Sequence, residues 1–184
     1  MFILASKSPR RKEILSSVIK DFKIIEANID ERRLCLPAYQ ISYELSKLKA
    51  YDVFAKHPDD VILACDTVVI FNGVIFNKPK DEQDAFEMLS KLSDNHHVVL
   101  SSYTLISKDF EISNTVRSDV YFNKLSPELI KEYIKTGSPL DKAGAYGIQD
   151  KQFNLVNHID GSYFNIMGLP IEVLTREFKR LNLI

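Results

Sequence analysis

Hydroxyl and guanidinium groups gather at the start of a predicted helix, in the segment Ser6-Lys7-Ser8-Pro9-Arg10-Arg11. Ser8 before Pro9 is typical of a helix start, with serine as the N-cap and proline in the first turn. The first turn of a helix exposes unpaired N–H groups and the positive end of the helix dipole, so it attracts phosphate. Arg10 and Arg11 would add bidentate hydrogen bonds. The segment is therefore either an anion site or a solvated basic helix start.

A carboxylate interrupts the apolar strand that the sequence predicts over Val61–Phe71. This residue, Asp66, directly precedes the hydroxyl of Thr67. A buried charge without a partner is costly, so Asp66 should face a cleft, a cation or a metal. Hard divalent ions prefer such oxygen ligands. The alternative is an aspartate at a strand end that pairs with a surface lysine.

Three further charged residues are candidates for the same site, although their spacing does not show that they meet. Lys49 lies at the edge of the apolar face of a predicted helix, and Lys78 precedes a proline in a loop. Either lysine could equally be exposed, which is the commoner fate of a lysine. Glu31 would add a second carboxylate, whereas Arg32 and Arg33 beside it are typical of surface charge.

A segment rich in small residues, Asp141–Gln149, combines both charges with an amide. Its glycines let the backbone approach a ligand closely. The amide of Gln149 can pair with the ring N–H and carbonyl of uracil or thymine, but after turning over it can also pair with cytosine. Gln149 alone therefore does not set the base. Gly144 and Gly147 fit neither the dinucleotide-binding pattern nor the P-loop pattern.

Alternating strands and helices should position these segments, and this alternation indicates an α/β fold with a mixed sheet. The predicted strands are Phe2–Ala5, Phe22–Ile25, Val61–Phe71, Val74–Phe76, His97–Ile106 and Ile112–Phe122. The predicted helices are Pro9–Val18, Tyr39–Phe54, one capped by Asp81 and ending at Leu92, one from Ser126-Pro127 to Lys135, and Ile171–Leu181. Asn72-Gly73 predicts a type I′ hairpin turn, and Lys108-Asp109 a second turn. Two short strands are expected between residues 135 and 171.

Composition places the chain among ordinary globular proteins of one domain, or of one domain with two lobes. The chain has 184 residues, 45% of them hydrophobic, with 24 basic and 25 acidic side chains. The near-zero charge removes the general argument for a nucleic acid polymer or an anionic membrane as partner. A small, locally bound anion remains compatible with it.

Cysteine usage and the N-terminus favour a cytoplasmic location. Cys35 and Cys65 lie far apart, without metal-ligand spacing, so we expect both to be reduced. Lys7 comes too early for the apolar core of a signal peptide. No apolar run approaches the ~20 residues that a membrane span requires.

Together, the segments resemble the Maf family of nucleoside triphosphate pyrophosphatases, over nearly the whole chain. The matching stretches are Leu4–Arg11 with Ile14-Leu15, Ile29–Glu31, Lys49-Ala50, Asp66–Val69, Lys78-Pro79, Leu92-Ser93 with His97 and Val99, Asp141–Gln149, Gly161–Asn165 and Gly168–Pro170. The joint match is far more specific than any single stretch.

The resemblance implies a single Maf-like domain over residues 1–184. Its fold would be α/β, with an elongated mixed β-sheet flanked by helices and two lobes with a cleft, as in the inosine-triphosphatase-like fold. It implies an enzyme that clears unwanted nucleotides by hydrolysing a nucleoside triphosphate to the monophosphate and pyrophosphate. A divalent metal cation, Mg²⁺ or Mn²⁺, would be required. The oligomeric state stays open, with a homodimer as one option.

The resemblance also implies roles for individual residues. Asp66 would be the proton acceptor, and Glu31 with Asp66 would hold the metal. Lys49 and Lys78 would neutralise phosphate charge. Substrate binding would fall to Ser6, Ser8, Arg10, Arg11, Thr67 and Gln149, of which Arg10, Thr67 and Gln149 match positions associated with substrate choice.

Two branches of this family differ in substrate. Ser-Pro-Arg-Arg together with Asp141–Gln149 resembles the branch that acts on dTTP and UTP, whereas the 7-methyl-GTP branch usually has an aromatic residue in place of Arg10. The chain departs from the usual pattern at Asn77, Asp94, Ser101, Ser138 and Asp150. The family also carries a septum-formation-inhibitor name, so the alternative function is a nucleotide-binding regulator of cell division with little hydrolysis. Retention of the charged residues named above favours the enzyme.

Overall fold

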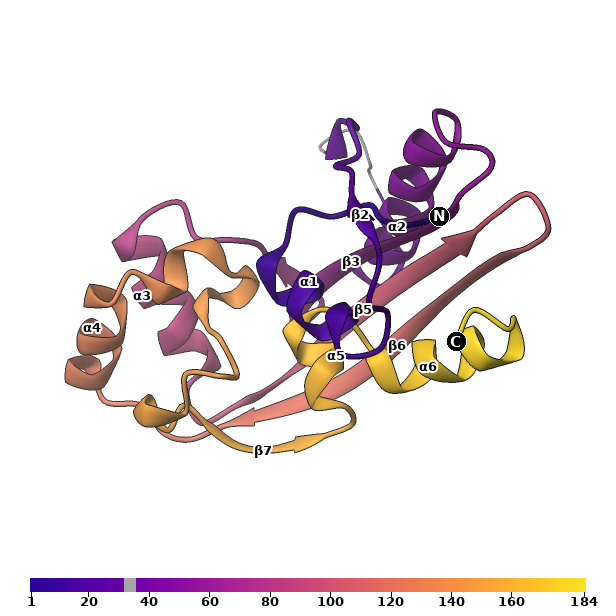
Figure 1. The fold of residues 1–184 in the computed structure, drawn as a ribbon. Coiled ribbons are helices and arrows are strands. Elements are labelled where there is room, and N and C mark those ends of the chain that lie inside the picture. Colours follow the sequence, from indigo (N-terminus) through magenta and orange to yellow (C-terminus); the bar gives the residue numbers. More distant parts are fainter. Residues whose placement is uncertain (32–35) are drawn as a thin grey trace. The chain divides into compact units, whose positions relative to one another are not determined.

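A computed structural model of the protein describes residues 1–31 and 36–184. The described residues form a seven-stranded sheet in the order β2-β1-β3-β5-β6-β7, with β4 paired to β3 (Figure 1). The strands are β1 (Phe2–Leu4), β2 (Lys23–Ile24), β3 (Val61–Phe71), β4 (Val74–Phe76), β5 (His96–Ile106), β6 (Glu111–Phe122) and β7 (Val156–Asp160). β1 runs parallel to β2 and β3, whereas β4 is antiparallel to β3 and β7 to β6. The predicted mixed sheet is confirmed.

The helices are α1 (Pro9–Ser16), α2 (Ala38–Phe54), α3 (Glu82–Leu92), α4 (Pro127–Lys135), α5 (Tyr163–Met167) and α6 (Ile171–Arg180). Three of them, α1, α3 and α4, begin where the sequence places their caps. Ser8, Asp81 and Ser126 each accept a hydrogen bond from the backbone N–H three residues later. Asn72 and Gly73 have φ angles of 50° and 77°, as the predicted type I′ turn requires.

Of the two short strands expected between residues 135 and 171, one is present and the other is not. This part of the chain holds one strand, β7, together with α5 and three 3₁₀ turns, η2 (Ser138–Asp141), η3 (Ala143–Ala145) and η4 (Lys151–Phe153). Gly144 lies inside η3 with a φ of 71°, and a Cβ there would lie 2.9 Å from Val69. A left-handed residue at such a close approach interrupts an extended strand.

The chain divides into two compact units. Unit 1 comprises Met1–Thr67, Ser101–Val116 and Gly168–Ile184, and unit 2 comprises Val68–Leu100 and Arg117–Met167. Each unit has its own hydrophobic cluster. Among the described helices, none is long and apolar enough to cross a membrane.

In unit 1, helix α2 packs on the sheet through a face that is partly polar. Ala50 and Val53 are fully buried in a cluster with residues of β1 and β3. Leu48, whose spacing fits the apolar residues Ile41 and Leu45 of the same helix, is 40% exposed. Ser42 and Ser46 share the inward face with Leu45, Ala50 and Val53, so the hydrophobic pattern alone gives only part of that face.

Two chains of hydroxyl groups fix α2 on strands β5 and β6. Each runs from a serine of the helix through a buried hydroxyl of β5 to a hydroxyl of β6, over 2.8–3.0 Å at each step. The chains are Ser42–Ser102–Thr115 and Ser46–Thr104–Ser113. Buried hydroxyls that are paired in this way avoid the cost of burial without a partner.

In unit 2, helices α3 and α4 lie side by side over one core (Figure 1). Leu89 of α3 and Ile130 and Tyr133 of α4 share a buried cluster with Phe122 of β6. Of the cysteines, Cys65 is a buried free thiol. The predictions for Cys35, Arg32 and Arg33 lie outside the described residues.

Candidate functional site

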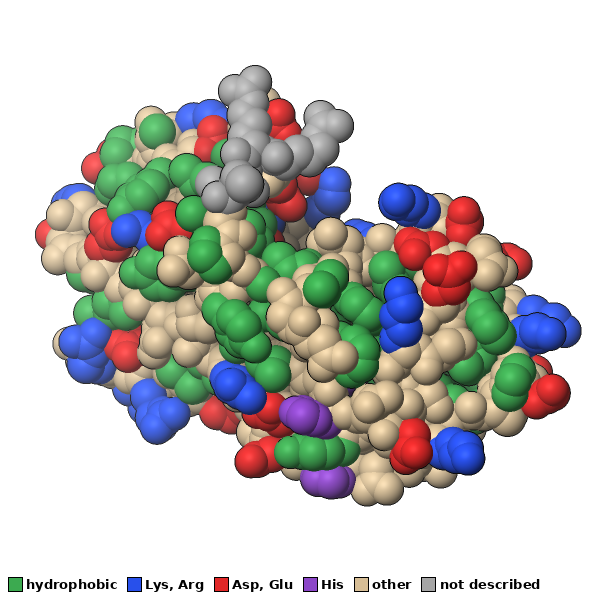
Figure 2. Space-filling view, turned by 180° about the vertical axis from the view of Figure 1, so that it is seen from behind, with side chains coloured by type: hydrophobic (Ala, Val, Ile, Leu, Met, Phe, Trp, Pro, Cys, Tyr) green, Lys and Arg blue, Asp and Glu red, His purple; other side chains and the backbone are tan. Residues whose placement is uncertain are grey.

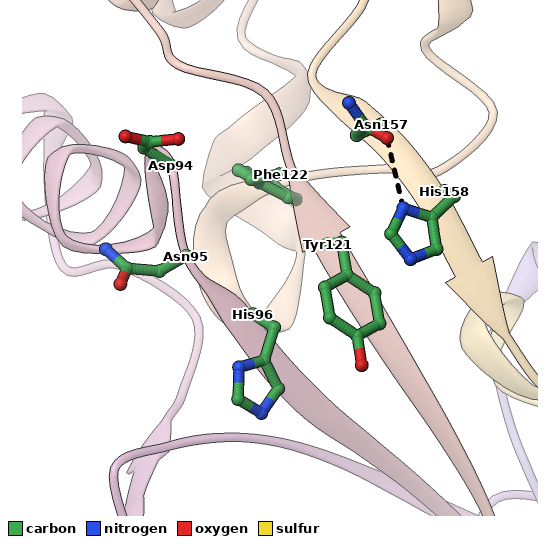
Figure 3. A pocket seen from close by; sticks show the side chains of 7 residues that line it. All are labelled: Asp94, Asn95, His96, Tyr121, Phe122, Asn157 and His158. Atoms are coloured by element: carbon green, nitrogen blue, oxygen red, sulfur yellow. Dashed lines mark hydrogen bonds between the residues drawn. The ribbon is translucent and has the colours of Figure 1, made fainter.

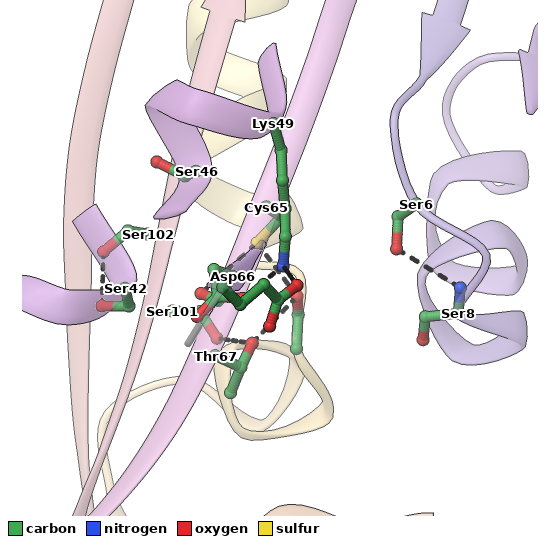
Figure 4. A network of polar contacts seen from close by, with 12 residues as sticks. Ser6, Ser8, Ser42, Ser46, Lys49, Cys65, Asp66, Thr67, Ser101 and Ser102 are labelled. Atoms are coloured by element: carbon green, nitrogen blue, oxygen red, sulfur yellow. Dashed lines mark hydrogen bonds and ion pairs between the residues drawn. The ribbon is translucent and has the colours of Figure 1, made fainter. Parts of the chain in front are cut away.

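Lys49 joins two carboxylates in unit 1. Its Nζ atom lies 2.6 Å from Oδ1 of Asp66 on β3 (Figure 4). The same atom lies 2.8 Å from Oε1 of Glu31. The Asp66 side chain is 10% exposed and that of Glu31 is 53% exposed. Three of the residues predicted to do chemistry therefore meet, although 17 positions separate Lys49 from Asp66.

Burial and charge act against each other in this cluster. Burial raises the pKa of Asp66, against the lowering effect of Lys49 and Arg11. Burial would lower the pKa of Lys49, but Asp66 and Glu31 outweigh it, so the pKa of Lys49 is raised. Lys49 therefore stays positively charged at neutral pH. A carboxylate with a raised pKa is a stronger base, which suits a proton acceptor.

Arg11 holds the strand on both sides of Asp66. Its guanidinium donates to the backbone carbonyl of Cys65 at 2.7 Å and to the hydroxyl of Thr67 at 3.0 Å. It also donates to the hydroxyl of Ser6 at 3.1 Å and to the carbonyl of Gly168 at 2.8 Å. We call these five residues the Arg11 cluster. Four of the five N–H donors of a guanidinium are thus used within unit 1.

Other predicted binding residues surround the Arg11 cluster. The Ser8 hydroxyl accepts from the backbone N–H of Arg11 at 3.4 Å, and the N–H of Ser8 donates to the Ser6 hydroxyl at 3.3 Å (Figure 4). Arg10 is half-buried in the first turn of α1. Thr67 also shares a hydrogen bond of 2.8 Å with Ser101. The structure thus gathers these predicted residues at the start of α1 and the middle of β3.

Lys78 and Gln149 belong to unit 2, so their approach to Asp66 stays a prediction. Within unit 2 the segments that carry them are in contact, because the backbone N–H of Gly144 donates to the carbonyl of Asn77 at 3.2 Å. Lys78 is exposed, and Gln149 is half-buried. The loop after the hairpin and the Asp141–Gln149 segment are therefore neighbours within this unit.

A polar depression elsewhere on unit 2 contains none of the predicted site residues (Figure 3). It is built on three stacked rings, because Tyr121 stacks on His158 with 4.1 Å between ring centroids and on His96 with 5.3 Å. Figure 2 shows two histidines on this face with an apolar side chain between them. The depression follows from neighbouring strands that place aromatic rings side by side.

His97 is a packing residue of the unit 2 core. It is 1% exposed, and its Nε2 atom lies 2.8 Å from the hydroxyl of Tyr146. Burial lowers the pKa of His97 to about 3, so the ring is neutral at physiological pH. Within residues 1–31 and 36–184, no group of three or more His, Cys, Asp and Glu side chains forms a cluster that could hold a metal ion.

Two polar residues near Gln149 were not predicted as site residues. The hydroxyl of Tyr133 contacts the turn that carries Gln149, and the carboxylate of Asp150 ends that turn. The only signal in the sequence was the departure from the family pattern at Ser138 and Asp150. In the structure the hydroxyl of Ser138 donates to Oδ2 of Asp150 at 2.7 Å.

Comparisons with known proteins identify both the family and the fold of the chain. The model of the family described as Maf-like protein matches residues 1–181. A dTTP/UTP pyrophosphatase of Clostridium perfringens is 41% identical over 98% of this chain and 97% of its own length. One of Thermosipho africanus is 47% identical over 92% of this chain and 87% of its own length. The solved Staphylococcus aureus Ham1 protein matches with a TM-score of 0.57 at 12% identity, covering 97% of each chain, which supports the predicted inosine-triphosphatase-like fold.

Proposed function

The chain belongs to the Maf family, and we propose that it is an enzyme that hydrolyses dTTP and UTP to the nucleoside monophosphate and pyrophosphate. The observation that carries this proposal is the buried pair of Lys49 and Asp66, with Nζ and Oδ1 2.6 Å apart. The two relatives compared above carry the name dTTP/UTP pyrophosphatase. Such an enzyme would act on the nucleotide pool, and we expect it in the cytoplasm.

The reaction needs a base for water and positive charge for the departing pyrophosphate. Asp66 would accept a proton from the water that attacks the α-phosphorus, and its raised pKa supports this role. Lys49 would stabilise the negative charge that develops on the phosphate oxygens. Lys78 would add charge from the loop of unit 2.

Asp66 and Glu31 would together hold a divalent cation. Both carboxylates reach one cationic group, the ammonium of Lys49. Mg²⁺ is commonly bound by one or two carboxylates plus substrate phosphates, so this pair of donors fits it. When bound, the cation would neutralise phosphate charge and polarise the P–O bond that breaks.

Substrate choice would rest on Arg10, Thr67 and Gln149. The first turn of α1 offers backbone N–H groups and hydroxyls to a phosphate, with Arg10 in the same turn. Gln149 would read the ring amide of thymine or uracil. Ser6, Ser8 and Arg11 would shape the phosphate end of the site through their mutual hydrogen bonds.

A substrate panel tests this function. The purified protein is incubated with dTTP, UTP, CTP, ATP, GTP and 7-methyl-GTP in Mg²⁺ or Mn²⁺, and pyrophosphate is measured against orthophosphate. We expect pyrophosphate and the monophosphate from dTTP and UTP, and much slower cleavage of the others. Nucleotide binding without pyrophosphate release would favour the regulator, and faster cleavage of 7-methyl-GTP would place the chain in the other branch.

A further inference from the structure

Gln149 lies in a tight turn of unit 2 that runs from Gly147 to Asp150. The backbone N–H of Asp150 donates to the carbonyl of Gly147 at 3.1 Å and closes the turn. Gln149 is the third of its four residues. The position of its side chain therefore depends on how the two ends of this turn are held.

One buried hydroxyl holds both ends. Tyr133 on α4 accepts from the backbone N–H of Gly147 at 2.9 Å and donates to Oδ2 of Asp150 at 2.5 Å. Its ring is fully buried and packs on Phe153, just beyond the turn, with 4.8 Å between ring centroids. Burial raises the pKa of Tyr133, so the phenol keeps its proton and remains a donor.

Two more side chains support the carboxylate of Asp150. The hydroxyl of Ser138 donates to its Oδ2 at 2.7 Å. Lys142, only 8% exposed, donates from Nζ to the carbonyl of Ser138 at 2.6 Å and to its hydroxyl at 3.0 Å. A chain of hydrogen bonds thus connects a buried cation to the end of the turn. Paired networks of this kind hold polar groups in one arrangement.

The amide of Gln149 lies directly against this network. A Cβ on Gly147 would lie 2.9 Å from Oδ2 of Asp150, 2.9 Å from Cε of Lys142 and 3.0 Å from Oε1 of Gln149. All three side chains therefore converge on the same glycine. There is no room for a larger residue at position 147 without a shift of these groups.

We propose that Tyr133, acting with Asp150, is a positioning residue for Gln149 and thereby for base selection. This inference rests on the proposed function. A glutamine amide that turns over exchanges its donor and acceptor, and then matches cytosine instead of uracil. A fixed turn limits the positions that the amide can adopt. Loosening the turn should therefore reduce discrimination between bases more than it reduces hydrolysis.

The test compares Tyr133→Phe with wild type on UTP and CTP. The ratio of kcat/KM for UTP to that for CTP should fall about 10-fold, as expected for the loss of one buried hydrogen bond to a charged group. The kcat for UTP should change less than this ratio. Tyr103 is also fully buried, but it lies in unit 1, away from the turn that carries Gln149. Tyr103→Phe is therefore the matched control and should leave the ratio unchanged. Thermal unfolding of each variant checks the fold.

A second variant and a double variant complete the experiment. Asp150→Ala removes the carboxylate to which Tyr133 donates, and it should lower the UTP-to-CTP ratio in the same way. This variant replaces Tyr133→Phe if that protein does not fold. In a Gln149→Leu background, Tyr133→Phe should have no further effect on the ratio, because the group that it positions is gone. An additional loss of the same size in that background would overturn the proposal.

Binding separates this inference from the proposed function. Calorimetry with UMP and CMP measures base preference without turnover. If the wild-type protein releases no pyrophosphate, the proposed function is refuted. Its preference for UMP over CMP still tests whether the turn positions Gln149. If wild type prefers UMP and Tyr133→Phe keeps that preference, the positioning role is wrong.

Discussion

The ammonium of Lys49 and the carboxylate of Asp66 form an ion pair in which both side chains are nearly buried, 13% and 10% exposed. Such a pair behaves differently from a surface pair, because removing one partner leaves the other charge in a poorly solvated place. Measuring both turnover and unfolding free energy on the same variants of Asp66, Lys49 and Lys78 distinguishes a role in catalysis from a role in stability.

Asp66→Asn should abolish most of the activity. The amide keeps the size of the side chain but cannot accept a proton from water, and loss of general base catalysis costs about 10²–10⁴-fold in rate. Pyrophosphate release from dTTP measures the effect, and circular dichroism checks the fold. Asp59→Asn, at an exposed position of the same unit, is the control. Retention of more than about a tenth of the turnover would refute the role of Asp66 as base.

Lys49→Ala and Lys78→Ala should both lower turnover but differ in stability. Lys49→Ala leaves Asp66 buried without its ammonium, and breaking a buried pair in this way costs about 3–5 kcal/mol of unfolding free energy. Lys78 is exposed, so Lys78→Ala should leave stability unchanged. Urea unfolding measures the stability of each variant, and pyrophosphate release from dTTP measures its turnover. Normal hydrolysis of dTTP by both variants would mean that these lysines do not serve phosphate.

Gln149→Leu should erase base preference more than it erases turnover on poor substrates. A site built to pair with a ring amide rejects the wrong base because its buried polar groups stay unpaired, at about 1–3 kcal/mol for each group. The measurement is kcat/KM for dTTP, UTP, CTP and GTP. An unchanged order of preference would assign base reading to other residues.

Arg11→Lys should lower both stability and turnover. Lysine keeps the charge but cannot donate in the planar fork that reaches Ser6, Cys65, Thr67 and Gly168 at once. We expect a loss of about 1–3 kcal/mol in unfolding free energy, together with slower hydrolysis, because the strand around Asp66 is less well held. Arg180→Lys, whose guanidinium pairs with Glu177 on the surface, is the control. Equal effects of the two substitutions would contradict the Arg11 cluster.

His97 should make the protein less stable in acid. Burial lowers its pKa to about 3, whereas an ordinary histidine titrates near 6.5, so between these values the unfolded chain binds one more proton. The unfolding free energy then falls with decreasing pH, by about 2 kcal/mol from pH 7 to pH 5. Urea unfolding at pH 7 and pH 5 measures this loss. In His97→Gln the difference between the two pH values should be smaller, and an equal difference would show that His97 is not its source.

Local signals in the sequence predicted much of the fold. Ser8, Asp81, Ser126 and the Asn72-Gly73 turn act on their own neighbours, so their effects can be read from a few residues. The path of residues 135–171 could not be read in this way, because it follows from close approaches such as that of Gly144 to Val69.

The candidate site was predictable in its residue types but not in its connections. The meeting of Glu31, Lys49 and Asp66 depends on how α2 is turned on the sheet, and Ser42 and Ser46 on its inner face conceal that rotation from the hydrophobic pattern. The bonds of Arg11 reach up to 157 positions along the chain. Such pairs arise from tertiary packing, which spacing in the sequence does not express.

The division of the chain into units also sets an order of folding. Unit 2 lies entirely within Val68–Met167, but unit 1 needs its first segment together with Gly168–Ile184. The ring of Phe2 packs edge-on against that of Phe178, with centroids 5.6 Å apart. During synthesis, β1 must therefore wait for α6 before its core is complete. Contacts between such distant residues slow folding, because a long loop closes before they form. We therefore expect the half of the protein that holds Asp66 to complete its core only after α6 has been made.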